Sequence, residues 1–247
     1  MIAFLSSKRV QGVYSLASNY GGLVARLILQ PIEESSRNYF GKLLASKDSK
    51  PSKLAVEEAR ENLAAILRTY ILTSIVIACG GPVLAPIAFR FVIGSRWEGT
   101  GVEDVLGIYC YYIPFLAING LTEAFVSSVA TKEEVDRQST WMLAFSAGFA
   151  GATYYYLGVL DMGAQGVVWA NVINMALRII WSFSFIRSYF KRNGAKFDLI
   201  SIRPEPMSLA GGLVIYMLTL KIVVFATEPL DQLKKGALFV LVGVIMM

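Results

Sequence analysis

The sequence contains no histidine, only two cysteines and few charged residues. Charged side chains make up 17% of the 247 residues, against roughly 25% in an average soluble domain. Without histidine, the chain lacks the commonest general base and the commonest metal ligand. Cys79 and Cys110 lie far apart in apolar segments, which favours two buried thiols over a disulfide or a metal site. The sequence therefore predicts a protein that is not an enzyme and holds no metal or cofactor.

Apolar residues are abundant and occur in long runs. They form 55% of the chain, and the mean hydropathy is +0.54. Several runs approach the roughly 20 apolar residues that are needed to span a bilayer. The net charge of +5 is carried by the segments between these runs, so it does not indicate a nucleic-acid partner. The pattern predicts an all-α polytopic membrane protein with membrane lipid as its surroundings.

The apolar runs predict about seven transmembrane helices. We expect Gly80, Gly81 and Pro82 to break the second helix, with a further apolar piece reaching Ile93, because proline removes a backbone donor. The seven expected ranges are Val13–Leu44, Ala55–Cys79, Val102–Ala130, Ser139–Leu157, Gly166–Phe190, Met207–Ala226 and Lys235–Met247.

Both ends of the sequence are abrupt. The segment Gly236–Met247 would form about 18 Å of helix, against a hydrocarbon core of about 30 Å. Residues 1–5 resemble the end of another apolar segment. We therefore expect the chain to be a fragment.

Lysine and arginine are concentrated in alternate loops. The loops after the first, third and fifth helices hold more of them than the other loops, which predicts that these three face the cytoplasm. We expect a five-helix part in residues 1–190, a basic cytoplasmic loop in 191–206 and the last helices in 207–247. The basic loop is either a solvated connector or a docking site for anionic lipid headgroups.

A row of polar residues runs along one face of the first helix. Such a row cannot face hydrocarbon, so we expect it to face a water-filled cavity or other helices. Arg26 either lines a cavity or pairs with a carboxylate that holds helices together. Pro31 cannot donate to the carbonyl of Leu27, so we expect a kink there. The polar residues of this segment are Ser15, Asn19, Arg26, Gln30, Glu33, Glu34 and Arg37.

Two further helices carry polar residues within apolar sequence. Asn119 and Glu123 lie one turn apart in the third helix, and Asn171, Asn174 and Arg178 share a face of the fifth. Glu123 either pairs with Arg26 or Arg178, protonates during transport, or forms interhelical hydrogen bonds. An arginine fork fits phosphate as well as carboxylate oxygens. These residues extend the candidate cavity site.

The fourth helix carries small residues at every fourth position, namely Ala144, Gly148 and Ala152. This spacing is typical of helices that pack closely against another helix in a membrane. We interpret it as a structural seam.

Several longer motifs occur in a fixed order along the chain. They are Gln11–Tyr14, Leu23–Leu27, Gln30–Ser35, Ala117–Glu123, Lys132–Arg137 and Ala170–Met175 with Arg178. Together they resemble the Rft family of endoplasmic reticulum membrane proteins, within the multidrug/oligosaccharidyl-lipid/polysaccharide exporter superfamily.

The resemblance implies two six-helix lobes around a central cavity, of which this chain would supply the C-terminal lobe. It implies translocation of dolichol-pyrophosphate-linked oligosaccharide across the endoplasmic reticulum membrane in protein N-glycosylation, with the N-terminal lobe of the same protein as a partner. Cavity arginines of superfamily relatives bind the pyrophosphate, which places Arg26 first among the candidates. The alternative is a scaffold or lipid-presenting membrane protein of the same pathway that does not itself transport.

Overall fold

The computed structural model describes residues 6–45, 51–93, 99–204 and 206–225, and every regular element in them is helical. The expected helix Lys235–Met247 and the segment 1–5 lie outside the described residues. The helices are α2 (Lys8–Val24), the π-helical turn η1 (Ala25–Leu29), α3 (Gln30–Leu43), α4 (Lys53–Ile93), α5 (Val102–Val129), α6 (Lys132–Tyr154), the π-helical turn η3 (Tyr155–Val159), α7 (Gly163–Arg192), the 3-10 turn η4 (Leu199–Ile202) and α8 (Pro206–Phe225).

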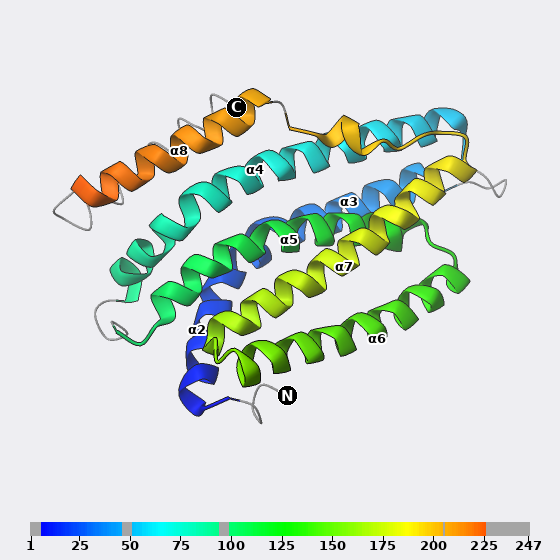
Figure 1. The fold of residues 1–247 in the computed structure, drawn as a ribbon. Helices are drawn as coiled ribbons and strands as arrows, with labels where there is room; N and C mark the ends of the chain where they lie inside the picture. Colours follow the sequence, from blue (N-terminus) through cyan, green and yellow to red (C-terminus); the bar gives the residue numbers. More distant parts are fainter. Residues whose placement is uncertain (1–5, 46–50, 94–98, 205, 226–247) are drawn as a thin grey trace.

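Helix α5 is the centre of the bundle. It contacts α2, α3, α4 and α7, whereas α8 lies along α4 on one side of the bundle and α6 lies along α7 on the other (Figure 1). The α5 sequence is apolar on nearly all sides, as expected of a helix surrounded by others. Glu103 and Asp104 in its first turn stabilise the positive end of the helix dipole.

Two apolar clusters hold the helices together. One cluster packs α3, α4, α5 and α7 around Phe125, whose ring lies 5.1 Å from Phe40 and 5.4 Å from Phe190 between centroids. The other packs α2, α5 and α7 around residues such as Val105 and Val168. Arg178 of the candidate site lies on the stretch of α7 between the two apolar clusters.

The expected irregularity at Leu27 is confirmed. The first predicted helix is divided by the π-helical turn Ala25–Leu29, which ends just before Pro31. Pro31 has no backbone N–H for the Leu27 carbonyl, and a π turn is one way in which a helix absorbs such a defect. The chain changes direction between α2 and α3 (Figure 1).

The expected break at Gly80-Gly81-Pro82 is wrong, because α4 continues through Pro82 and Pro86. The glycines serve packing instead. A side chain at Gly81 would press on Cys110 of α5 at 2.9 Å, and one at Gly107 would meet the Pro82 carbonyl at 3.2 Å. Close contact between α4 and α5 thus requires glycine on both helices, while the helical path keeps most backbone groups hydrogen-bonded.

The fourth helix begins earlier than expected, at Lys132 instead of Ser139. Thr131 and Glu134 form a capping box, in which the Glu134 amide donates to the Thr131 hydroxyl and the Thr131 amide donates to the Glu134 carboxylate. The segment that we expected to be a loop is therefore the first two turns of α6. The small-residue seam of this helix is largely exposed at Ala144 and Gly148, and nothing in the described part of the chain lies within 4 Å of a side chain added at Gly148.

The expected bounds of α5, α7 and α8 are close to those observed, although the predicted end of the last, Ala226, lies outside the described residues. The connector after α7 is anchored to the bundle. Phe197 and Ile202 are buried in the first cluster, and Arg68 donates to the Ser201 carbonyl at 2.6 Å.

Within the described residues, three helical segments are long and apolar enough to cross a membrane, namely Lys53–Arg90, Val102–Val129 and Gly163–Arg192. Both cysteines are free, and Cys110 is buried. The sequence predicted two buried thiols, which is confirmed for Cys110, whereas Cys79 is only partly buried.

The capping box predicts a pH-dependent stability. Glu134 lies beyond the end of the α5 span, and its pKa is lowered chiefly by a hydrogen bond from Arg192, with the Thr131 amide assisting. A carboxyl group whose pKa is lowered on folding stabilises the fold fully above its ordinary value of 4.5 and loses this contribution as the pH falls through the folded value. We expect the melting temperature of the unaltered chain to fall more steeply on acidification than that of Glu134→Gln. Parallel pH profiles would contradict this.

Candidate functional site

An ion pair between Arg178 of α7 and Glu123 of α5 forms the centre of the candidate site. Arg178 Nε donates to Glu123 Oε1 at 2.9 Å, and Nη2 donates to both carboxylate oxygens at 2.7 and 2.8 Å. The two side chains are 28% and 23% exposed. Both charges lie on helices long enough to span a membrane, where an unpaired charge costs at least about 2.5 to 3.5 kcal/mol. Of the partners considered for Glu123, the structure pairs it with Arg178.

Several buried polar atoms of the helices that carry this ion pair, and of α4, have no hydrogen-bond partner among the described residues. Asn119 lies one turn before Glu123 and Asn174 one turn before Arg178, and the side-chain oxygens of both asparagines are buried without a hydrogen-bond partner among the described residues. The Tyr70 hydroxyl on α4 is in the same state. Buried polar atoms are nearly always hydrogen-bonded. The polar layer formed by the ion pair, the two asparagines and Tyr70 therefore has side-chain atoms that are free to form hydrogen bonds with further polar groups.

Glu33 of α3 joins the layer from a third helix. Its carboxylate lies so close to Gly120 that a side chain at Gly120 would overlap it. Glu33 also interacts electrostatically with Glu123, Tyr70 and Arg37. Gly120 is therefore the residue that lets an acidic side chain approach the central helix.

Arg26 differs from Arg178 because it lies on the exposed side of η1. Its Nη2 donates to the Asn19 carbonyl at 3.0 Å, and its Nε donates to the Gly22 carbonyl at 3.4 Å. Within the described ranges, no carboxylate forms an ion pair with it. The guanidinium is thus bound by backbone oxygens, and among the described residues it has no carboxylate partner of the kind that structural pairing would require.

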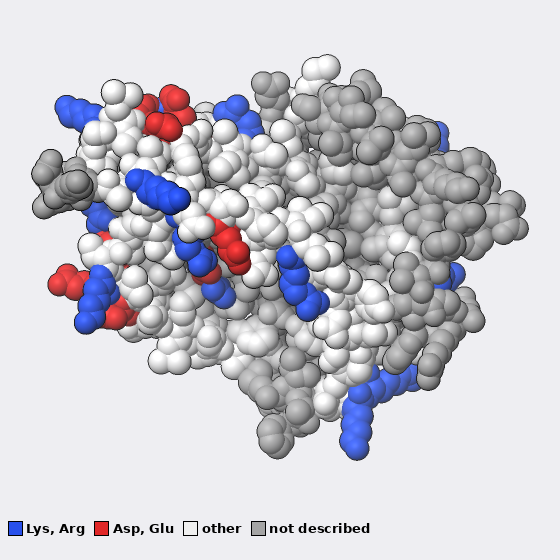
Figure 2. Space-filling view, turned by 180° about the vertical axis from the view of Figure 1, so that it is seen from behind, with Lys and Arg blue, Asp and Glu red and all other residues white. Residues whose placement is uncertain are grey.

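The rest of the polar row of the first helix is exposed. Gln30 donates to Glu34 at 3.1 Å within α3, and Asn19 is exposed on α2. The side of the molecule that faces away from the viewer in Figure 1 carries basic and acidic side chains in its left and central parts in Figure 2, among mostly uncharged surface. The exposed residues of the row are Ser15, Asn19, Arg26, Gln30, Glu34 and Arg37.

Asn171 has a different surrounding. Its amide donates to the Tyr14 hydroxyl at 3.1 Å and to the Val167 carbonyl at 3.0 Å. These bonds connect α7 to α2 and leave Asn171 with a structural role in this arrangement.

The structure thus brings Glu33, Glu123 and Arg178 together and keeps Arg26 apart from them. Sequence reasoning missed Tyr70, because a single tyrosine in an apolar run carries no signal of its contacts. In the described part of the chain, no group of three or more acidic or cysteine side chains is placed to hold a metal ion.

The ion pair generates a stability prediction. Glu123→Gln should leave the Arg178 charge unpaired and lower the free energy of unfolding by about 3 kcal/mol, the lower part of the range for broken buried pairs. Leu143→Ala, at a 75% exposed position of α6, should change it by less than about 0.5 kcal/mol. Denaturant unfolding in detergent micelles measures both. A double-mutant cycle with Arg178→Gln should show strong coupling, whereas additive effects would contradict a direct pair.

Sequence comparisons identify related proteins. The sequence pattern of the family described as Rft protein matches residues 1–247. A relative from Candida glabrata is 40% identical over 181 residues, which is 73% of this chain and 32% of the relative. One from Saccharomyces cerevisiae is 39% identical over 191 residues, 77% of this chain and 33% of the relative. One from Candida albicans is 31% identical over 259 residues, 100% of this chain and 46% of the relative.

All three relatives carry the name Man(5)GlcNAc(2)-PP-dolichol translocation protein RFT1. The chain spans between a third and a half of the length of these relatives. No solved structure matches the chain. The match over all 247 residues, with these identities, shows that the chain belongs to the Rft protein family.

Proposed function

We propose that this chain forms part of a protein that translocates dolichol-pyrophosphate-linked oligosaccharide across the endoplasmic reticulum membrane for protein N-glycosylation. The observation that carries the proposal is Arg26, an exposed guanidinium that is held by backbone carbonyls and has no carboxylate partner in the described ranges. A planar guanidinium fits phosphate oxygens in a two-point contact. The names of the relatives support this class of substrate.

The two arginines of the site have separate roles in this proposal. Arg178 is neutralised by Glu123 and positions α5 against α7, so it is a poor ligand for a second anion. Arg26 contacts the pyrophosphate. Asn19, Gln30, Glu33, Glu34, Asn119, Asn171 and Asn174 are the further polar residues of the proposed cavity, with Glu123 and Arg178.

The mechanism is alternating access, in which the headgroup crosses in a polar cavity while the polyprenyl tail stays in lipid. Arg26 lies within the π-helical turn before Pro31, where the regular α-helical hydrogen bonding is interrupted. Such turns occur often at functional sites. A change in the direction of the chain at this turn would move Arg26 while the helix pair α5–α7 stays in place.

The proposal includes the wider architecture. About seven spans would form the C-terminal lobe of a two-lobe exporter in the multi-pass endoplasmic reticulum membrane, with residues 1–190 as the five-helix part, 191–206 as a cytoplasmic loop and 207–247 as the last helices. The partner would be the N-terminal lobe of the same protein. The three membrane-length helices and the length of the relatives support this arrangement.

A membrane scaffold that presents the lipid without transporting it is the second candidate. The small-residue seam of α6 favours it, because Ala144 and Gly148 are exposed and leave room for another helix. A scaffold would depend on this seam and not on the charge of Arg26.

The role of Arg26 is tested in cells depleted of their own family member. A chimera carries residues 1–247 in place of the matching segment of the Candida albicans relative, which the chain matches over its whole length. Arg26→Gln should reduce occupancy of glycosylation sites and raise the pool of unprocessed lipid-linked oligosaccharide, because one charge-assisted contact of about 1.5 to 3 kcal/mol is lost. Arg26→Lys should retain part of the function.

The matched control is Arg137→Gln, which removes an exposed charge from the start of α6 and should leave both readouts unchanged. Immunoblotting checks that all variants reach equal levels. Normal glycosylation with Arg26→Gln, together with a defect from Gly148→Leu, would overturn the transport proposal in favour of the scaffold.

A further inference from the structure

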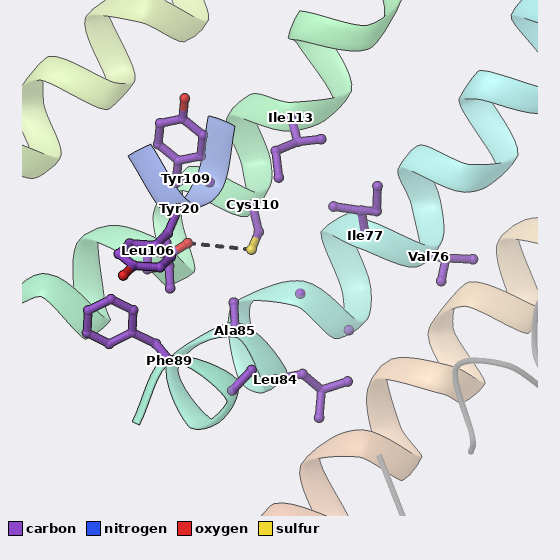
Figure 3. A pocket seen from close by; sticks show the side chains of 14 residues that line it. Tyr20, Val76, Ile77, Leu84, Ala85, Phe89, Leu106, Tyr109, Cys110 and Ile113 are labelled. Atoms are coloured by element: carbon purple, nitrogen blue, oxygen red, sulfur yellow. Dashed lines mark hydrogen bonds between the residues drawn. The ribbon is translucent and has the colours of Figure 1, made fainter. Parts of the chain in front are cut away.

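A pocket of about 390 Å³ lies between α2, α4 and α5. Its walls are formed by aromatic and aliphatic side chains, and none of the fourteen lining residues, all within the described ranges, is charged. Tyr20, Tyr109 and Phe89 lie on one side of it, and Ile77 and Val76 lie on the other (Figure 3). The volume falls within the roughly 300–1,000 Å³ of ordinary ligand pockets.

The pocket depends on residues without side chains. Gly21, Gly80 and Gly81 all line it. A side chain at Gly21 would overlap the Tyr109 ring, and one at Gly81 would press on Cys110. Gly21 and Gly81 therefore let Tyr109 and Cys110 of α5 pack directly against the backbones of α2 and α4, and this close packing shapes the pocket wall.

The pocket lies next to Arg26. A methyl group added to Gly22 would come within 3.8 Å of Arg26 Nη2 and 4.0 Å of the Tyr109 hydroxyl. The Tyr109 ring lines the pocket, so its hydroxyl end is close to the guanidinium. A cation and an apolar cavity thus adjoin each other, as a ligand with an anionic head and an aliphatic tail requires.

We propose that this pocket binds the first isoprene units of a polyprenyl pyrophosphate whose phosphates contact Arg26. The proposal rests on the proposed function and adds a tail site to it. A cavity of about 150 Å³ takes up one six-carbon benzene molecule, so a pocket of about 390 Å³ has room for about three five-carbon isoprene units by the same scale. The remainder of the tail would lie in lipid.

The surrounding membrane determines what such a pocket contributes. Lipid tails are as apolar as the pocket wall, so entry of the isoprene units gains no hydrophobic transfer energy. The tail site therefore selects by shape and fixes the position of the ligand, while Arg26 supplies the attraction. A straight acyl chain differs in shape from an isoprene chain because it lacks the methyl branches.

The two cysteines provide the test, because Cys110 lines the pocket and Cys79 does not. The purified chain is placed in phosphatidylcholine nanodiscs as Cys79→Ala, which retains Cys110, and as Cys110→Ala, which retains Cys79. A membrane-permeant maleimide labels the remaining thiol. Polyprenyl pyrophosphate at ten times its dissociation constant should slow labelling of Cys110 about tenfold, in proportion to the unoccupied fraction, and leave that of Cys79 unchanged.

A second measurement uses a polyprenyl pyrophosphate with a photoreactive group in its first isoprene unit. Ala85→Phe places a large ring in the pocket and should reduce photolabelling about tenfold. Ala65→Phe makes the same change at an exposed position of the same helix, and photolabelling of this variant should equal that of the unaltered chain. Circular dichroism checks the helical content of both variants.

The proposal is overturned if polyprenyl pyrophosphate leaves the Cys110 rate unchanged, if it protects both thiols equally, or if phosphatidic acid protects Cys110 as well as the polyprenyl compound does. These measurements need no glycosylation. Protection of Cys110 together with normal glycosylation by Arg26→Gln would therefore support the pocket and count only against the proposed function.

Discussion

The bidentate ion pair between Arg178 and Glu123 is the constraint on which the rest of the structure depends. It joins the central helix α5 to α7, with Glu123 between Leu121 and Phe125 of the first apolar cluster. In a bundle of membrane-length helices these two charges are stabilised by forming an ion pair, because hydrocarbon offers neither of them a partner. Once they are paired, neither charge is left for a ligand. Arg26 is held by backbone carbonyls in the described part of the chain, and in the proposed function it is the cation that recognises the anion.

Glycine and proline determine where the helices of this bundle approach and bend. Gly81 and Gly107 let α4 and α5 come into close contact, and Gly120 admits the Glu33 carboxylate to the polar layer. Pro31 follows the π-helical turn that divides the first long helix beside Arg26. The residues that weaken helices in water thus serve contact and bending here, because a hydrocarbon surrounding offers the backbone no hydrogen-bond partners outside the helix.

Much of this arrangement is predictable from local sequence, and its failures have physical causes. Runs of apolar residues predicted α5 and α7 closely, because membrane-length helices need little more than length and apolarity. The break at Pro82 was wrong because packing against α5 overrides a local proline signal. The start of α6 was missed although Thr131 and Glu134 have capping-box spacing. The partner of Glu123 required the tertiary structure, because two arginines were equally plausible along the sequence.

We propose that Arg26 binds a pyrophosphate whereas Arg178 does not. The direct measurement is the dissociation constant of a polyprenyl pyrophosphate for the purified chain in nanodiscs, at low and high salt, for the unaltered protein, Arg26→Gln and Arg37→Gln. We expect Arg26→Gln to weaken binding by about tenfold, or 1.4 kcal/mol, and to reduce its salt dependence, with Arg37→Gln close to the unaltered chain. Equal affinities and equal salt dependence for all three proteins would contradict the binding of pyrophosphate by Arg26.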